Sequence, residues 1–310
     1  MTFDVEQISF QLGEENFSVE EICINTGRDF KRLISKSGFV NVYRTRLSEK
    51  EFFGNFIAKK LKIESEDTLI FVNQGLGSLI PGKIPYLFEG MSNFDDTLFL
   101  ELSDGCTGFV RALILANALI SSKSSSRVHI ICAEKYSAYF LDSDSAVSPI
   151  FSDAISLTTL VSGSSYNLIS SSVSNSFEKS ELISTHRDES DTLKLRMEGS
   201  SVLAWAMNQV PSNLEVLFQK SGLTKSEIDT WYFHQGSKVM IEMLADKIGL
   251  ENNGLFSAEQ IGNTTSSSIP IALNQVKGLR NTRQSDGENI VLVGFGVGLS
   301  IVSALIRVNA

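Results

Sequence analysis

A cysteine in a glycine-rich segment is the first candidate for chemistry in this chain. Cys106 lies in the segment SDGCTGF, which joins an apolar, strand-like run to an apolar, helix-like run. A helix amino terminus offers unpaired N–H groups and the positive end of the helix dipole, and both favour a thiolate over a thiol. The position therefore predicts a nucleophilic cysteine of lowered pKa. A buried structural cysteine is the alternative, and it is the usual fate of a single cysteine.

A histidine and an asparagine later in the chain are candidates to work beside that thiol. His234 follows an aromatic strand-like run, whereas His129 lies inside an apolar run and His186 inside a polar one. We interpret the last two as structural or solvated residues. Asn263 follows a glycine and precedes a run of small residues. Taken singly, His234 is equally compatible with packing, and Asn263 with a turn that caps a helix.

Two glycine-rich segments resemble nucleotide-binding loops without meeting their requirements. The segment Gly77–Ile84 approaches the phosphate-loop pattern, but Ile84 stands where a Mg²⁺-binding Ser or Thr is needed. The segment Gly294–Ser300 (GFGVGLS) has the spacing GxGxG and is followed by about a dozen residues, too few for the rest of a dinucleotide-binding unit. We therefore expect neither an NTPase nor a dinucleotide-binding enzyme. The second segment instead predicts a turn with exposed backbone N–H groups.

Composition narrows the class of protein. The chain has 310 residues, of which 42% are hydrophobic, so it can bury a large core. A net charge of -9 argues against a nucleic-acid partner. Three widely spaced cysteines without a CxxC pair exclude a disulfide framework and a cysteine-rich zinc site. With no secretory signal at the amino terminus, these features predict a reduced, cytoplasmic protein.

The uncharged run Ile290–Ile306 approaches the length of a membrane span. Its three glycines at alternate positions and its many β-branched residues favour two buried strands joined by a glycine turn. We therefore expect no membrane span.

Apolar runs typical of buried strands alternate with helical patterns along the chain, which predicts a layered α/β protein. The helical pattern from Val202 to Leu223 is expected to be interrupted near Pro211. The serine-rich stretch Ser162–Ser176 suggests a surface loop or edge strands, and we take it as the boundary region. The predicted halves are residues 1–160, with the cysteine, and residues 161–310, with the histidine and asparagine.

Six segments, taken in order, resemble the β-ketoacyl-acyl-carrier-protein synthase III family of the thiolase superfamily. They are DGCTGFVRALILANALI around Cys106, AEKYS, MEGSSVLAWAM, LTKSEIDTWYFHQ ending beside His234, GNTTSSSIPIAL with Asn263, and GFGVGLS. The resemblance covers most of the chain from about Ser103 onward. It implies an α/β, thiolase-like, five-layered αβαβα fold made of two similar halves, usually in a homodimer.

The same resemblance implies an acyltransferase and assigns roles to residues. Cys106 takes an acyl group from a thioester, and a malonyl-type thioester then enters and loses CO₂ while His234 and Asn263 stabilise the enolate. The backbone N–H groups of Cys106 and Val297 form the oxyanion hole. No metal or resident cofactor is implied, because coenzyme A or phosphopantetheine thioesters, the latter on acyl carrier protein, are substrates. Fatty-acid or specialised-metabolite synthesis is the expected pathway.

The chain departs from the family pattern around the substrate. Gly236 and Ser237 follow the histidine where the family commonly has Ala-Asn, and Val297 stands where it usually has Gly. SDAIS replaces a GDGAG-like run. The other expected substrate-binding residues are Lys36, in a weakly matching KSGF segment, Arg32, which matches a base-stacking tryptophan, and Ile80, which matches a residue that the partner subunit inserts into the acyl pocket. These departures favour a specialised member of the family.

Local charge and two other functions remain to be weighed. Residues 28–46 contain six cationic side chains and one acidic one, which gives a net charge of about +5 and suits an acidic carrier protein or coenzyme A phosphates. A solvated helix face is the alternative.

The chain is also compatible with acyl transfer to an amine or hydroxyl, or with a non-catalytic partner subunit of a heterodimer.

Overall fold

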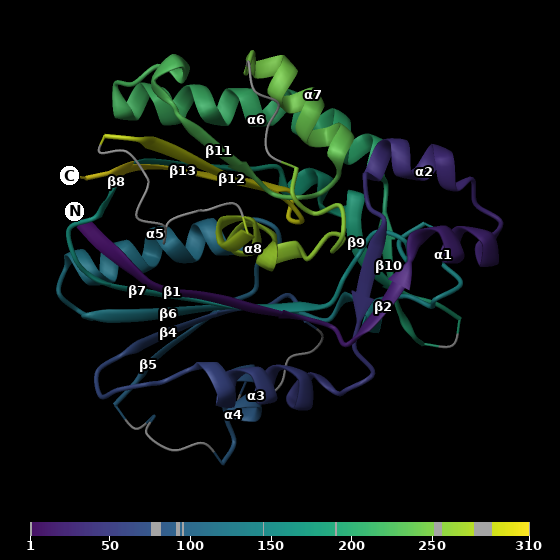
Figure 1. Ribbon diagram of the computed structural model, residues 1–310, viewed down its shortest axis with the longest axis horizontal. Helices are drawn as coiled ribbons and strands as arrows, with labels where there is room; N and C mark the ends of the chain where they lie inside the picture. The colour runs from purple at the N-terminus through teal and green to yellow at the C-terminus, as the bar shows by residue number, and fades with distance from the viewer. Residues whose placement is uncertain are drawn as a thin grey trace.

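The computed structural model describes residues 2–75, 82–90, 94, 96–144, 146–189, 191–250, 256–275 and 287–309. Within them, helices and strands alternate in five layers, and a pair of central helices lies between two sheets (Figure 1). The predicted five-layered α/β fold is therefore confirmed. The central helices are α5 (Gly108–Ser121) and α8 (Ser268–Gln275). The outer helices are α3 (Glu49–Lys60) and α4 (Lys83–Leu87) on one side, and α6 (Gly199–Ser221) and α7 (Lys238–Ile248) on the other.

Each sheet layer is a set of neighbouring strands. The layer next to α3 has the order β1-β7-β6-β4-β5, and the layer next to α6 has the order β8-β13-β12-β11. A short antiparallel pairing of β1 with β8 joins the two layers. The first layer comprises β1 (Thr2–Leu12), β4 (Thr68–Val72), β5 (Leu98–Leu102), β6 (Arg127–Glu134) and β7 (Ala154–Ser162). The second comprises β8 (Tyr166–Asn175), β11 (Thr230–Phe233), β12 (Asn289–Gly296) and β13 (Ser300–Val308).

The strand β12 of the second layer is apolar on both faces because helices cover both. Along β12, Ile290 and Leu292 pack against the central helices, whereas Val291 and Val293 pack against α6 and α7. A strand buried in this way has no polar face, which explains its continuous apolar sequence. The run that approached membrane-span length is thus two strands, as predicted. No helix among the described residues is long and apolar enough to cross a membrane.

One local prediction is wrong. The helix α6 is continuous through Pro211, because Val210, Leu214 and Leu217 are buried against the sheet and this packing outweighs the one backbone hydrogen bond that proline removes. Of the two alternatives for the serine-rich stretch, the edge strand fits better than the surface loop. The stretch contains β8, which pairs with β13 along its length and with β1 only at Tyr166 and Asn167, so most of β8 forms one edge of the second layer. The division at residue 160 stays a prediction, and it falls near the end of β7.

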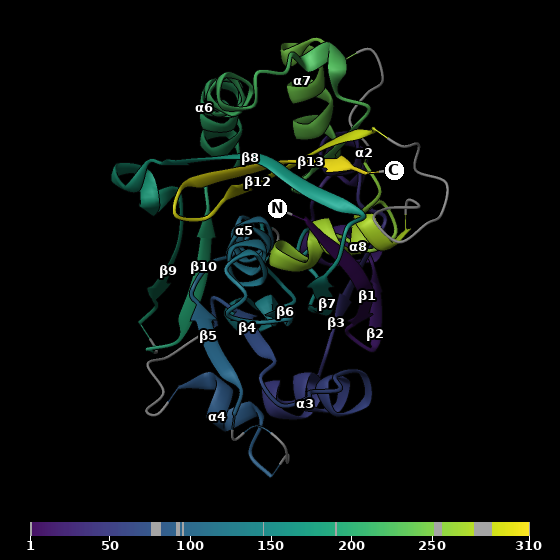
Figure 2. The same cartoon turned by 90° about the vertical axis from the view of Figure 1, so that its left-hand side faces the viewer.

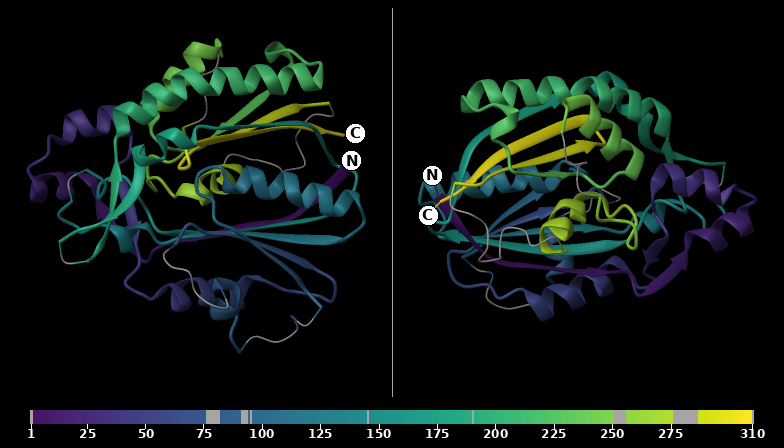
Figure 3. Two further views of the ribbon diagram at one scale, coloured as in Figure 1. Left: turned by 180° about the vertical axis from the view of Figure 1, so that it is seen from behind. Right: turned by 45° about the horizontal axis from the view of Figure 1, so that its top comes forward.

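A small cap lies at one end of the layers (Figure 3). It contains β2 (Glu15–Ser18), α1 (Val19–Thr26), α2 (Phe30–Ser37) and β3 (Asn41–Arg44). A separate two-stranded sheet of β9 (Ile183–Arg187) and β10 (Leu193–Met197) lies at the same end of the layers as the cap (Figure 1), and the turned view separates it from β2 and β3 (Figure 2). The helix α2 contacts α7, so the cap reaches across to the second half of the chain.

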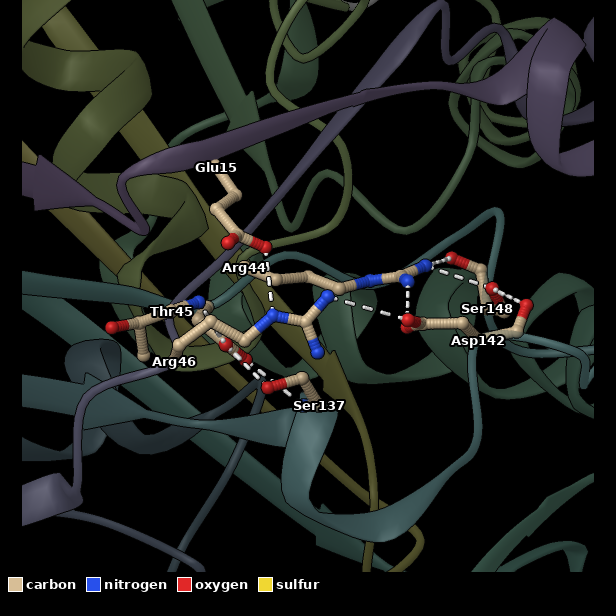
Figure 4. Close-up of polar contacts among 8 residues, drawn as sticks. Glu15, Arg44, Thr45, Arg46, Ser137, Asp142 and Ser148 are labelled. Carbon is tan, nitrogen blue, oxygen red and sulfur yellow. Dashed lines mark hydrogen bonds and ion pairs between the residues drawn. The ribbon is translucent and has the colours of Figure 1, made fainter.

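Two arginines, one of them buried, attach the cap to the segment that follows β6 (Figure 4). Arg44 is 2% exposed, donates to Asp142 and to the backbone carbonyl and hydroxyl of Ser148, and stacks over Phe17. Arg46 forms ion pairs with Glu15 and Asp142. These two arginines are therefore occupied within the protein. The predicted basic patch is reduced to the four cationic residues between 28 and 36.

Asp153 is the second buried anchor of the cap. Its carboxylate accepts hydrogen bonds from the Thr45 backbone N–H at 3.0 Å and from the Ser137 backbone N–H and hydroxyl at 2.9 and 2.5 Å. Burial raises the pKa of this carboxyl group, and the hydrogen bonds oppose that shift. Asp153 belongs to the SDAIS segment, which departs from the family pattern. Its carboxylate has a structural role, because it attaches the cap to the segment that follows β6.

We expect Asp153→Ala to lower the free energy of unfolding by about 3 kcal/mol, because it leaves one buried and two partly buried donors without an acceptor. Denaturant unfolding measures the change. The exposed Asp246 on α7 provides the matched control, and Asp246→Ala should alter stability by no more than about 0.5 kcal/mol. Equal effects of the two substitutions would contradict the anchoring role.

Candidate active site

One cavity of about 440 Å³ brings together the three residues singled out first in the sequence. Cys106, His234 and Asn263 all line it, although they lie in segments far apart in the chain. Four more of the expected site residues share the cavity: Lys36, Gly236, Ser237 and Val297. The remaining wall is largely apolar and comes from the cap, the β9–β10 sheet and the first turn of α6. Such a lining is typical of a site that binds a small molecule.

The turn before α5 positions Cys106. Asp104 accepts a hydrogen bond from the Thr107 hydroxyl at 2.6 Å and forms an ion pair with Arg111 on α5. The helix itself begins at Gly108, so Cys106 precedes it rather than opening it. A side chain at Gly108 would collide with Val72 on β4, since its Cβ would lie 2.3 Å from a methyl group there. The cysteine turn is therefore packed tightly onto the first sheet layer.

The prediction that Cys106 has a lowered pKa is wrong. Burial raises the pKa of its thiol to about 12, because the ionised form would lose its hydration. The backbone N–H groups of Val297 and of Cys106 itself act in the opposite direction, but they do not offset burial. The thiol is therefore protonated in the free protein at neutral pH.

The glycine turn between β12 and β13, in the second sheet layer, contacts Cys106. A Cβ on Gly296, whose φ is +149°, would lie 2.8 Å from the cysteine sulfur. Only a residue without a side chain fits there. This contact brings the Val297 N–H close to the sulfur, so two backbone donors converge on one place. That is the arrangement expected of an oxyanion hole.

His234 follows β11 and is buried beside the cavity. Its Nδ1 lies 2.7 Å from the Ser268 hydroxyl, and its ring packs edge-on against Phe295. Burial lowers the pKa of His234 to about 3, although a hydrogen bond to the Thr265 backbone raises it in part. The imidazole is therefore neutral across the physiological range, which suits a hydrogen-bond donor better than a general acid.

The side-chain amide of Asn263 is oriented by its own loop. Its Oδ1 accepts the Thr265 backbone N–H at 2.9 Å, which leaves its NH₂ group as the donor available to the cavity. Thr265 adopts a φ of +52°, an uncommon value for a β-branched residue and a common form of strain at functional sites. Asn263 does not cap α8, which begins only at Ser268, although its hydrogen bond to Thr265 closes a turn directly before the 3-10 helix Thr265–Ser267.

The expected substrate-binding residues divide into three groups. Lys36 and Gly236 line the cavity, as does Ser237, whose hydroxyl also caps α7 by accepting the Met240 N–H at 3.3 Å. Arg32 is exposed on α2 and does not line the cavity. Ile80 lies outside the described residues. Among those residues, no cluster of three or more His, Cys, Asp or Glu side chains could bind a metal ion.

Comparison with known proteins identifies the family. The family model for 3-oxoacyl-(acyl-carrier-protein) synthase III matches residues 100–176, and the model for its C-terminal part matches residues 218–308. A β-ketoacyl-(acyl-carrier-protein) synthase III of Halalkalibacterium halodurans is 30% identical over 231 residues, which cover 71% of this chain and 69% of the relative. The chain belongs to the 3-oxoacyl-(acyl-carrier-protein) synthase III family. The predicted membership of this family of acyltransferases is thus confirmed.

Other synthase III proteins match along the whole chain. One from Lactococcus lactis is 26% identical over 99% of this chain and 100% of its own length. The crystal structure of the Aquifex aeolicus synthase III shares the fold with a TM-score of 0.85, at 18% identity, over 99% of this chain and 100% of the other. The Xanthomonas campestris OleA structure, with bound lauric acid and lauroyl-CoA, has a TM-score of 0.80 at 14% identity, over 99% of each chain.

Sequence reasoning missed one buried polar group near Cys106 in this member of the synthase III family. Glu134, at the end of β6, is 0% exposed and accepts the Gln74 backbone N–H at 3.1 Å and the Ser266 hydroxyl at 3.4 Å. Burial raises the pKa of this carboxyl group well above its ordinary value. The hydroxyl of Tyr136, two residues further along the chain, donates to the side-chain oxygen of Gln74. An acid at the end of an otherwise apolar strand was the signal available in the sequence.

The raised pKa of Cys106 predicts a particular pH dependence of alkylation. The rate with iodoacetamide should rise about tenfold for each pH unit from 7 to 10 without a plateau, because the thiolate fraction keeps growing below the pKa. Mass spectrometry of the peptide that contains Cys106 measures the rate, and circular dichroism checks that the protein stays folded. Glutathione should level off near pH 9 and serves as the control. A plateau for Cys106 below pH 9 would contradict the effect of burial.

Proposed function

We propose that this protein takes an acyl group from a coenzyme A or phosphopantetheine thioester onto Cys106 and condenses it with a malonyl-type thioester. The main support is the single cavity in which a thiol, a neutral imidazole and a side-chain amide meet, with two backbone N–H groups beside the sulfur. Family membership supports the same class of reaction. Lipid synthesis, of fatty acids or of a specialised product, is the process that we propose.

In the first step, the Cys106 sulfur bonds to the carbonyl carbon of the acyl thioester. The C–S bond to coenzyme A then breaks, and the proton of the cysteine thiol leaves with the coenzyme A thiol. Negative charge develops on the carbonyl oxygen between these events, where the N–H groups of Cys106 and Val297 stabilise it. A thiol that keeps its proton until the thioester arrives agrees with the raised pKa.

In the second step, a malonyl thioester loses CO₂. The bond between its carboxylate carbon and its central carbon breaks, and the electron pair passes into an enolate whose oxygen accepts hydrogen bonds from His234 and Asn263. The enolate carbon then attacks the acyl group on Cys106, and the cysteine leaves as a thiolate that is reprotonated. A neutral His234 supports this role, because a neutral imidazole keeps one N–H group that can donate a hydrogen bond to the enolate oxygen.

The entrance to the cavity and one sheet edge support the proposed partners. Arg28 and Lys36 line the cavity, and Lys31 and Arg32 are exposed beside them, so an acidic carrier protein or the phosphates of coenzyme A meet complementary charge. The strand β5 is at the end of the described sheet order, and its Leu98 is 47% exposed. We propose that a second copy of the chain covers this edge in a cytoplasmic homodimer.

Covalent acylation of Cys106 tests the first step. We expect intact-mass spectrometry after incubation with a panel of acyl-coenzyme A donors to show a gain of one acyl group, which Cys106→Ala abolishes. Cys23→Ala removes another buried thiol, on α1, and should leave the gain unchanged. A mass gain that survives Cys106→Ala would overturn the assignment of the nucleophile.

Release of CO₂ from a malonyl thioester tests the second step. His234→Ala and Asn263→Ala should each slow this release about 100-fold or more while acylation of Cys106 persists, since each removes a donor to the enolate. Asn208→Ala changes an exposed asparagine of α6 and should have no effect. Acyl transfer to an amine or hydroxyl without CO₂ release would favour the tailoring reaction instead.

A further inference from the structure

A second, smaller cavity adjoins the first. It measures about 150 Å³, and β9 and β10 form part of its wall. Tyr136, Ile183 and Val297 line both cavities, whereas Cys106 lines only the larger one. The small volume is below the roughly 300 Å³ at which ordinary ligand pockets begin. It therefore suits a short group rather than a long chain.

Gln74 is the polar residue of this small cavity nearest to the cysteine turn. A Cβ on Gly105 would lie 2.3 Å from the Gln74 Oε1, so the amide packs directly against the residue before Cys106. The Gln74 backbone N–H donates to the buried Glu134, and its Oε1 accepts the Tyr136 hydroxyl at 2.7 Å. These contacts fix the orientation of the amide. Its NH₂ group donates no hydrogen bond to any of the described residues and is left for a ligand.

The remaining wall of the small cavity is also rich in oxygen. Tyr136, Tyr139, Ser184 and Thr185 contribute hydroxyl groups, and no cationic side chain lines it within the described part of the chain. The Tyr136 hydroxyl already donates to Gln74 and the Ser184 hydroxyl to the Glu181 carbonyl. An alkyl chain in this space would remove water from the Gln74 NH₂ group and offer it no hydrogen bond, which is costly. A carboxylate would lose its hydration without gaining a positive partner. A neutral oxygen accepts from the NH₂ group without either cost.

We infer that the small cavity receives the acyl group carried by Cys106, and that Gln74 selects a short acyl group bearing a neutral hydroxyl or carbonyl oxygen over an alkyl group of the same length. This inference rests on the proposed function, because it requires that Cys106 is acylated. Gln74 would then be a specificity-determining residue, held in place by Glu134 and Tyr136.

A competition between two donors of equal chain length tests the selection. The protein is incubated with equimolar butyryl-coenzyme A and 3-hydroxybutyryl-coenzyme A, and intact-mass spectrometry gives the initial ratio of the two acyl-enzymes. We expect a preference of about tenfold for the hydroxylated group in the unaltered protein, and a loss of that preference in Gln74→Leu. Octanoyl-coenzyme A should label the unaltered protein at least tenfold more slowly than either.

Two further variants complete the test. Gln219→Leu makes the same chemical change on the exposed face of α6 and should leave the ratio unaltered. Thr185→Val lies on the exposed strand β9, where folding tolerates it, and should shift the ratio in the same direction as Gln74→Leu.

The outcomes separate this inference from the function on which it rests. Equal labelling by the two donors, preference for the butyryl group, or an unchanged ratio in Gln74→Leu would overturn the selection while leaving the acyl-cysteine in place. Absence of labelling by any acyl donor would instead overturn the proposed function, and this inference with it.

Discussion

The close contact between a glycine turn and a buried cysteine is the constraint on which the site depends. Cys106 belongs to the first sheet layer and its central helix, whereas Gly296 belongs to the second layer. The two layers must therefore lie at one fixed separation for the Val297 N–H to reach the sulfur. The central helices α5 and α8 set that separation, because they fill the space between the sheets with apolar side chains. Packing deep in the core thus determines the geometry of the chemistry.

Burial has the same electrostatic effect on three titratable groups close to the nucleophile. It raises the pKa of the Cys106 thiol and the Glu134 carboxyl group and lowers that of the His234 imidazole, so each group favours its neutral form. The surroundings of the sulfur therefore contain donors and acceptors but little charge. Fixed N–H groups are arranged in advance for the charges that arise during a reaction.

The sequence was informative where a pattern reflects local packing and less so where distant groups meet. The paired strands β12 and β13 and the place of His234 after β11 followed from apolar periodicity. The pKa of Cys106 was predicted in the wrong direction, because the sequence shows the adjoining helix but not the loss of hydration. Arg44 was counted as a surface charge since nothing near it indicates Asp142 or Ser148. The contact of Gln74 with Glu134 joins two strand ends, and only the sheet order reveals it.

The missing side chain at Gly296 has a consequence for how the sequence can change. Positions 106 and 296 occupy one space, so the residues tolerated at one depend on the residue at the other. A larger residue at 296 becomes sterically possible only if the cysteine side chain is displaced or replaced, and replacement removes the nucleophile. The glycine is therefore fixed for as long as the cysteine acts, and a library aimed at this turn would have to leave both positions unchanged.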